Sequence, residues 1–225
     1  MNQTIYLDNN ATTALAPAVL DAMLPYLVSE YGNPSCASES GAKVKKTLGE
    51  ARFAIASLLG AAPAEVVFTS GATESNHTAI LGARSLNKNK RHLVTSQVEH
   101  PSALLMFQQL ERLGMEVTFL RVDEEGRLDL ASLQAALRSD TALVSLMWAN
   151  NETGVIFPIQ EAAVMAHQAG ALFHTDATQM LGKLCIDVGL TEIDFLSCSA
   201  HKIHGPKGIG ALFVRKGVHL PPLFH

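Results

Sequence analysis

From residue 65 onward, short runs of apolar and β-branched residues alternate with longer stretches of helical periodicity. The runs typical of strands lie at residues 66–70, 92–96, 117–122, 142–148, 171–175, 195–198 and 211–214, and the helical stretches near 73–86, 101–113, 131–138 and 159–169. Because parallel strands need crossover connections, which helices supply, this alternation predicts a mainly parallel seven-stranded sheet. We therefore expect a three-layer α/β fold with helices on both faces and a ligand at the carboxyl ends of the strands.

The residues before this alternation predict an extended piece and two helices. Residues 4–13 read as extended, a helix begins after Pro17, and the turn formers at residues 31–34 end it. A second helix is predicted over residues 41–59, with Gly60 as its C-terminal stop. The apolar residues on one face of this helix are Val44, Leu48, Ala51, Ile55 and Leu58.

Charge and composition exclude several classes of protein. With 17 Lys and Arg against 21 Asp and Glu, the net charge is −4, and the chain has no long basic tract, which argues against nucleic acid and anionic membranes as partners. The N-terminus lacks the pattern of a signal peptide, and no apolar stretch reaches the roughly 20 residues of a membrane span. We expect a cytoplasmic protein, whose three cysteines do not form a disulfide framework.

The stretch 195–210, FLSCSAHKIHGPKGIG, places Lys202 between Ser199 and His201 on one side and a Gly-Pro-Lys-Gly turn on the other. This setting suits a lysine that is held in place. Our interpretation is that Lys202 forms a Schiff base with pyridoxal 5'-phosphate (PLP), while the hydroxyl and imidazole beside it donate to the phosphate. The rival lysine, Lys207, fits a solvated position in the turn.

Three other predicted strands end in residues that such a cofactor needs. Gly71 lies in a small-residue turn that opens a helix, which is an anion site, although ordinary capping by Ser70 or Thr73 is the alternative. The turn is not a Walker loop. His100 could stack on the cofactor ring or lie on the surface, and Asn151 could donate to its phenolic oxygen or simply form a turn.

Asp176 follows the strand predicted at residues 171–175. With Gln179 three residues later, it fits a capping box at the start of a helix. Its carboxylate could also pair with the pyridine nitrogen of PLP and keep that nitrogen protonated. Both interpretations can hold together.

Two other kinds of site fit the sequence less well. Cys198, His201 and His204 are spaced three apart, but a second ligand pair is lacking and the lysine among them would repel a metal ion. We therefore predict no metal site. The glycines after His204 precede a strand instead of opening a helix, which excludes a dinucleotide-binding loop.

Several motifs together resemble one family. YLDNNATT, GNPS, VFTSGATES, EHP, WANNETGV, HTDATQ and SAHKIHGPKGIGAL follow one another over nearly the whole chain. In this order they resemble the class V aminotransferase family of fold type I PLP enzymes, and within it the cysteine desulfurases of the NifS type. The resemblance implies the fold of the large domain of PLP-dependent transferases.

The resemblance also implies a role for each site residue. Lys202 and His100 would be catalytic, with Lys202 carrying the cofactor and His100 stacking on its ring. The remaining cofactor-binding residues would be Ala72, Thr73, Ser199 and His201 at the phosphate, Asn151 and Gln179 at the phenolic oxygen, and Asp176 at the pyridine nitrogen.

The implied reaction removes sulfur from L-cysteine and leaves L-alanine and a protein-bound persulfide. The freed lysine would take the Cα proton. The implied sulfur acceptor is an iron–sulfur scaffold protein in nitrogenase cluster assembly and nitrogen fixation, and the full-length form would be a homodimer. Alternatives are a selenocysteine lyase, a class V transaminase, or a non-catalytic PLP-binding remnant.

The sequence departs from the family pattern at two places. Residues 36–41 read CASESG where the family has a His and then Phe-Gly, and the chain stops at His225, where family members continue into a second domain. We therefore expect residues 1–15 to be a segment that joins the missing small domain, and residues 16–225 to be an incomplete PLP-binding large domain without sulfur-transfer activity.

None of the three cysteines suits the nucleophile of the implied reaction, which needs exposure and a lowered pKa. Cys198 is predicted in the core or the cofactor wall, and Cys185 is predicted to pack against apolar neighbours. Cys36 is predicted in a loop, and the family has a serine there.

Overall fold

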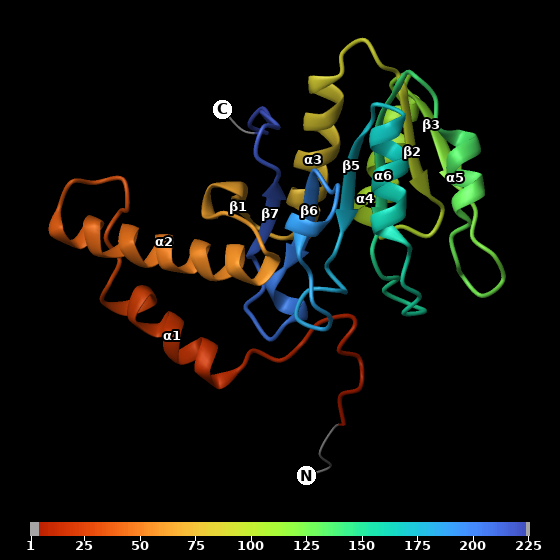
Figure 1. The fold of residues 1–225 in the computed structure, drawn as a ribbon. Helices are drawn as coiled ribbons and strands as arrows, with labels where there is room; N and C mark the ends of the chain where they lie inside the picture. Colours follow the sequence, from red (N-terminus) through yellow and green to blue (C-terminus); the bar gives the residue numbers. More distant parts are fainter. Residues whose placement is uncertain (1–4, 224–225) are drawn as a thin grey trace.

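The computed structural model describes residues 5–223, so the ends of the predicted segments 1–15 and 16–225, and Thr4 of the extended piece, lie outside the described residues. A seven-stranded sheet forms the centre of the molecule, in the order β1-β7-β6-β5-β4-β2-β3 (Figure 1). Its strands are β1 (Val66–Thr69), β2 (His92–Ser96), β3 (Glu116–Leu120), β4 (Thr141–Met147), β5 (Leu172–Asp176), β6 (Phe195–Ser199) and β7 (Gly210–Val214). The predicted strands are confirmed within two residues at either end.

The sheet is parallel from β6 through β5, β4 and β2 to β3, whereas β7 runs antiparallel to both β6 and β1. Residues 200–209 contain only the short 3-10 helix η3 (Ala200–Lys202), too little chain for a crossover helix. The chain therefore turns back directly beside β6, because an antiparallel neighbour needs only a short connection. The prediction of a mainly parallel sheet is confirmed.

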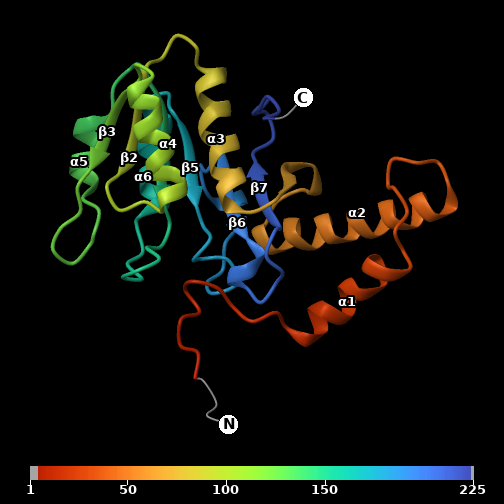
Figure 2. The same cartoon turned by 180° about the vertical axis from the view of Figure 1, so that it is seen from behind.

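Four helices cover the two faces of the sheet: α3 (Ala72–Leu86), α4 (Pro101–Arg112), α5 (Leu130–Ala136) and α6 (Ile159–Gln168). On one face, Ile80 of α3 and Phe107 of α4 belong to one buried cluster. On the other, Leu133 of α5 and Ala163 of α6 belong to a second. Figure 2 shows α4 in front of the strands, and Figure 1, which views the molecule from the opposite side, shows α6 in front of them. The three-layer α/β prediction is confirmed.

An arm of two helices, α1 (Pro17–Val28) and α2 (Glu39–Leu59), extends to one side of the sheet (Figures 1 and 2). Both helices were predicted, and Gly60 ends α2 with a left-handed φ of 68°. The side chains of Leu48 and Leu58 are exposed, although the sequence places them on the apolar face of α2. Only the C-terminal end of α2 reaches the core, through Ala56 and Leu59.

A strap at the N-terminus, residues 8–16, crosses the carboxyl ends of the strands. The backbone N–H of Thr13 donates to the carbonyl of His201 (2.8 Å), and that of Ala16 donates to the carbonyl of His204 (3.0 Å). The Thr13 hydroxyl also accepts from the His204 N–H (2.8 Å). These bonds hold the strap against the segment that contains Lys202.

Candidate active site

A cavity of about 460 Å³ lies at the carboxyl ends of the strands. Its wall is built by the β1–α3 turn, the segments that follow β2, β4, β5 and β6, and the strap. All nine residues predicted to bind the cofactor line it, namely Ala72, Thr73, His100, Asn151, Asp176, Gln179, Ser199, His201 and Lys202. The strands bring together residues that are up to 130 positions apart in the sequence (Ala72 to Lys202). Their individual roles stay predictions.

The N-terminus of α3 forms one end of the cavity. Gly71 is its N-cap residue, and no side chain caps the helix, so the alternative of capping by Ser70 or Thr73 is wrong. The Ser70 backbone N–H instead donates to the Glu74 carboxylate (2.8 Å), and the hydrogen bonds from Ser70 lower the pKa of Glu74. The first-turn N–H groups of a helix have no partner within it, so this end of α3 can bind an anion.

Gly210 sets the distance between this turn and β7. A Cβ atom at Gly210 would lie 2.6 Å from the carbonyl oxygen of Cys198 and 2.7 Å from the Cα of Gly71. Only glycine therefore lets the start of β7 pack so closely against the turn. This contact places the anion-binding end of α3 beside β6 and the lysine segment.

Asp176 presents its carboxylate to the cavity from the end of β5. One carboxylate oxygen accepts from the Thr178 N–H (3.0 Å) and the other from the side-chain amide of Asn76 (2.8 Å). Gln179 does not complete a capping box, because its amide bonds to Asn10 and Lys183. No helix follows β5 directly, so the capping-box prediction is wrong, and the carboxylate is held toward the cavity.

A hydrogen-bond chain joins Asp176 to His100. The Asn76 amide that donates to Asp176 also donates to the Ser102 hydroxyl (2.9 Å), which lies 2.8 Å from Nδ1 of His100. The Ser102 backbone N–H points at the same nitrogen (3.1 Å). Since a backbone N–H can only donate, Nδ1 is the acceptor and a neutral His100 ring carries its proton on Nε2.

Lys202 is half-buried, and its amine donates to the backbone carbonyl of Asn10 in the strap. Burial and the neighbouring Lys183 cation lower the pKa of Lys202, although Asp176 opposes the shift. Burial and the Lys202 cation in turn lower the pKa of His201. A lowered pKa leaves more of the Lys202 amine unprotonated at neutral pH, as a nucleophilic lysine requires.

The two asparagines after β4 have different surroundings. Asn150 is buried, donates to the carbonyl of Val98 (3.1 Å), and accepts from the N–H groups of Glu152 and Thr153 (2.9 Å each). It is therefore the turn residue that shapes this loop. Asn151 lines the cavity, and its amide donates to the Glu152 carboxylate (2.6 Å).

Glu99 is a buried carboxyl group that the sequence analysis missed. One oxygen accepts from the Ser96 hydroxyl (2.6 Å) and from the Met147 N–H (3.1 Å), which ties the end of β2 to β4. The other oxygen is buried without a partner among the described residues. Burial raises the pKa of Glu99 to about 8, so this carboxyl is mostly neutral at pH 7. The sequence signal that could have revealed Glu99 is its position in the EHP motif, directly before His100.

Cys198, His201 and His204, considered above for a metal site, lie in separate environments from one another and from the buried His174. Cys198 points into the core, where its thiol donates to the carbonyl of Ala211 (3.5 Å). His174 is fully buried between the hydroxyls of Ser145 (2.7 Å) and Ser197 (2.9 Å), and burial lowers its pKa to about 4. Within residues 5–223 there is no group of three His, Cys, Asp or Glu residues that could hold a metal ion.

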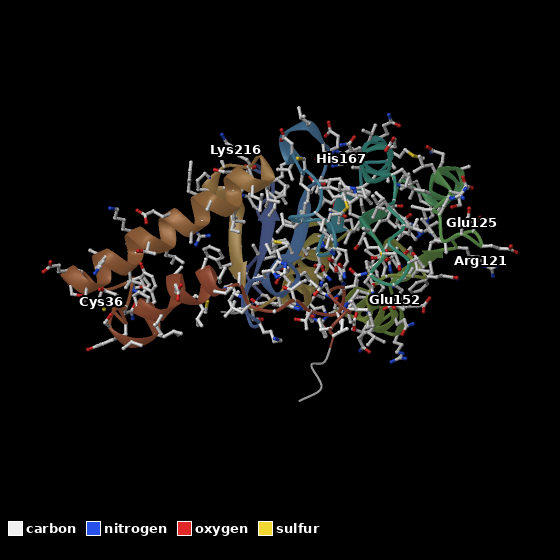
Figure 3. The ribbon with its side chains drawn as sticks, turned by 90° about the horizontal axis from the view of Figure 1, so that it is seen from below. Cys36, Arg121, Glu125, Glu152, His167 and Lys216 are labelled. Carbon is white, nitrogen blue, oxygen red and sulfur yellow. The ribbon has the colours of Figure 1, made fainter. Side chains whose placement is uncertain are left out.

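The three thiols differ in exposure. Cys198 is buried, as predicted, and desolvation raises its pKa to about 12. Cys185 is exposed, so the prediction that it packs is wrong: residues 182–185 lie on the surface between the buried side chains of Leu181 and Ile186. Cys36 is exposed as well, and Figure 3 shows it near the outer end of the arm. None of the three lines the cavity.

Comparisons with known proteins agree with this architecture. The family described as "Aminotransferase class-V" matches residues 5–224. The chain is 52% identical to "Cysteine desulfurase 2" of Trichormus variabilis over 97% of its length, and 53% identical to "Cysteine desulfurase" of Cereibacter sphaeroides over 98%. It spans only 55% and 58%, respectively, of these curated relatives.

Solved structures are similar over the whole chain. "NIFS-LIKE PROTEIN" superposes with a TM-score of 0.96 at 37% identity, over 99% of this chain and 62% of that one. "SspA in complex with cysteine" gives 0.95 at 42% identity, over 99% and 65%. No helix within residues 5–223 has the length and apolar character of a membrane span. The chain belongs to the class V aminotransferase family, and its curated relatives at about 50% identity are cysteine desulfurases.

Proposed function

We propose that this chain carries the cofactor site of a PLP-dependent cysteine desulfurase. The observation that carries the proposal is the single cavity in which Lys202 faces Asp176 and the N-terminus of α3. The names of the relatives support cysteine desulfurase activity, and the similar SspA structure is a complex with cysteine. The proposed substrate is L-cysteine, which would yield L-alanine and sulfur held as a persulfide.

The donors and acceptors of the cavity fit PLP. The helix N-terminus and the hydroxyl of Ser199 suit a phosphate, and the Asp176 carboxylate suits a protonated ring nitrogen. The hydroxyl of Thr178, another residue lining the cavity, is buried without a partner among the described residues, so it can still donate to a ligand. Lys202 supplies the amine for covalent attachment. The cavity thus offers partners for the phosphate, the ring nitrogen and the aldehyde of the cofactor.

Each of these side chains has a defined task in the proposed reaction. Bound PLP would act as an electron sink that labilises the Cα proton of an amino acid. The Lys202 amine would accept that proton, and its lowered pKa favours the unprotonated form that this task needs. Asp176, held by Asn76 and the Thr178 N–H, would accept a hydrogen bond from the ring nitrogen. His100 presents an Nε2 proton donor, since its Nδ1 is occupied.

The remaining parts of the proposal concern the protein's partners. We propose an iron–sulfur scaffold protein as sulfur acceptor, in nitrogenase cluster assembly, together with a homodimeric form in the cytoplasm. The NifS-type motifs of the sequence support this assignment. The persulfide needs a reactive thiolate, and Cys198 does not fit this role because its thiol is buried and its pKa is raised to about 12.

Titration of the chain with PLP tests the assignment of Lys202. The wild-type chain is expected to develop the long-wavelength absorbance of lysine-bound PLP, and borohydride reduction should fix the cofactor on the peptide that contains Lys202. Lys202→Ala should abolish both signals. Lys207→Ala, which removes an exposed lysine at the same cavity, is the matched control and should retain them. Equal spectra for wild type and Lys202→Ala would refute the proposal.

The substrate is tested by the products formed from amino acids. For a full-length form, cysteine desulfurase activity predicts alanine and sulfide from L-cysteine in the presence of a thiol reductant, in equal amounts, whereas we propose that the chain of 225 residues does not transfer sulfur. A transaminase would instead yield a keto acid, and a selenocysteine lyase would prefer selenocysteine. Keto-acid formation in place of alanine would overturn the proposed substrate while leaving the cofactor site intact.

A further inference from the structure

Lys183, in the segment after β5, contacts Gln179, one of the residues that line the cavity. Its ammonium group lies 2.6 Å from Oε1 of Gln179 and 3.4 Å from the side-chain oxygen of Asn10. An ammonium group can only donate hydrogen bonds, so Oε1 of Gln179 is fixed as an acceptor. The amide of Gln179 is therefore held in one of its two possible orientations, with Nε2 as the group that donates.

The orientation of this amide determines what holds Lys202. Nε2 of Gln179 donates to the backbone carbonyl of Asn10 (2.9 Å), and the Lys202 amine donates to the same carbonyl. If the amide turned over, Oε1 would face this carbonyl oxygen, and two acceptors would repel each other. The contact between Lys183 and Gln179 thus stabilises the part of the strap that carries the acceptor of Lys202.

Lys183 has no counter-ion among the described residues that would explain its position. Within residues 5–223 it forms no salt bridge with a carboxylate, and its oxygen neighbours belong to two amide side chains. Partial burial lowers the pKa of Lys183. A cation near a second lysine without a paired anion destabilises both charges. The two amide oxygens are therefore the groups that hold the Lys183 ammonium in place.

The charges around Lys202 include both signs. Lys183 lowers the pKa of Lys202, while Asp176, Asp8 and Glu152 raise it. His201 is the adjacent titratable group, and its own pKa is lowered. Because the side chain of Lys183 is largely exposed, solvent screens its charge, and its direct hydrogen bonds are the stronger part of the effect.

We propose that Lys183 is a positioning residue, which holds the Gln179 amide and, through the strap, the Lys202 amine. Its importance for a reaction rests on the proposed function, in which Lys202 carries the cofactor. The geometric part does not depend on any cofactor, because every contact in the series belongs to the chain itself. The two parts can therefore be tested separately.

The test is competitive acetylation of the chain without PLP, over a range of pH, with the modified lysines quantified by peptide mass spectrometry. Lys183→Met removes the ammonium group and keeps a linear stem, whereas Lys183→Arg keeps the charge and the donors. Because Lys183→Met should weaken the hydrogen bond from the Lys202 ammonium to the Asn10 carbonyl, we expect it to lower the pH midpoint of Lys202 labelling and to increase the labelling rate at pH 8 by roughly two- to fivefold. A raised midpoint would mean that only the charge of Lys183 acts on Lys202, and would overturn the inference. Lys183→Arg should restore wild-type behaviour, and Lys45→Met, at an exposed lysine of α2, is the matched control.

A double-mutant cycle distinguishes positioning from charge alone. In a Gln179→Leu background, Lys183→Met should have much less effect on Lys202, because the amide that transmits the contact is gone. An equal effect in both backgrounds, or an unchanged Lys202 midpoint in Lys183→Met, would overturn the inference. If PLP fails to bind the wild-type chain, the proposed function fails, but the acetylation result still decides the role of Lys183.

Discussion

The cavity rim and the helical arm differ sharply in how their side chains are held. At the rim, Asp176, Asn76 and Ser102 are fixed by hydrogen bonds between elements far apart in the sequence. On the arm, α1 buries no side chain, and Leu24 and Leu27 are exposed. A hydrogen bond between the hydroxyls of Tyr26 in α1 and Thr47 in α2 (2.9 Å) links the two helices of the arm, and Lys43 forms an exposed ion pair with Glu30.

Apolar residues are therefore buried in the sheet but largely exposed on the arm. In the sheet, apolar strand residues enter the two buried clusters on opposite faces, as Leu93 and Val94 of β2 do, so most of the apolar strand sequence is buried. In the arm, helical periodicity is present, but among the described residues nothing packs against most of the apolar face. The site therefore depends on the sheet for its geometry, and the arm should contribute little to the stability of the part described here.

The largest expected effect follows from truncating one side chain in each region. Phe173→Ala removes a fully buried ring from β5 and should lower the free energy of unfolding by about 3–5 kcal/mol. Leu24→Ala removes a side chain of α1 that is 51% exposed and should change it by less than about 0.5 kcal/mol. Urea denaturation followed by circular dichroism measures both.

Ile193→Val gives a milder test if Phe173→Ala does not fold. Ile193 is fully buried, and loss of one methylene there should cost about 0.5–1.5 kcal/mol. A cost for Leu24→Ala that equals or exceeds that of Ile193→Val would contradict the comparison, because it would show that the arm is packed in solution.

An intermediate effect is expected from the buried carboxyl of Glu99, whose folded pKa of about 8 lies above its usual 4.5. The stabilisation from its neutral form is complete below about pH 4.5 and is lost as the pH rises through about 8. Between pH 6.5 and 8, each pH unit should therefore cost about 1.4 kcal/mol. Glu99→Gln keeps a neutral group of the same shape, and should remove this loss.

The measurement compares the free energies of unfolding of wild type and Glu99→Gln at several pH values in this window. His174, whose folded pKa is lowered to about 4, is present in both proteins, so its titration cancels in the comparison. The two proteins should converge in stability toward lower pH. Parallel curves for wild type and Glu99→Gln would show that Glu99 is ionised in the folded protein.

The same contrast explains what the sequence could predict. The strands and helices followed from periodicity, and the nine site residues lie together because parallel strands end at one edge of the sheet. The residues that hold them were missed. Asn76 lies in the second turn of α3, and Lys183 follows an ordinary turn, so neither has a local pattern. Their tasks arise only from contacts across the fold, such as that between Asn76 and Asp176, 100 positions apart.

The capping-box error has a related cause. Asp176 and Gln179 have the spacing of a helix start, and a local pattern contains nothing that competes with it. In the folded chain, Asn10 and Lys183 offer the Gln179 amide other partners, and the chain after β5 forms turns. The placement of Cys185 was wrong because an apolar neighbourhood in sequence does not decide which side chains of an irregular segment face the core.

The smallest effect is a difference in thiol reactivity, which changes no stability. In the folded chain at pH 8, a thiol reagent should modify Cys36 on the arm and Cys185, both exposed, well before Cys198. The Cys198 thiol is buried against the carbonyl of Ala211, and its pKa of about 12 leaves very little thiolate. Mass spectrometry, which counts the modified thiols over time, gives the rates. Cys36→Ser shows which of the two fast sites is Cys36.

Unfolding in urea should make all three thiols equally reactive, because it removes the burial that protects Cys198. If Cys198 reacted as fast as Cys36 in the folded chain, the sheet around β6 would have to open as readily as the arm. The wall of the cavity next to Lys202 would then be mobile, and hydrogen bonds across the sheet could not hold the site residues in place. Slow modification of Cys198 is therefore a direct measure of how firmly β6 and β7 support the candidate site.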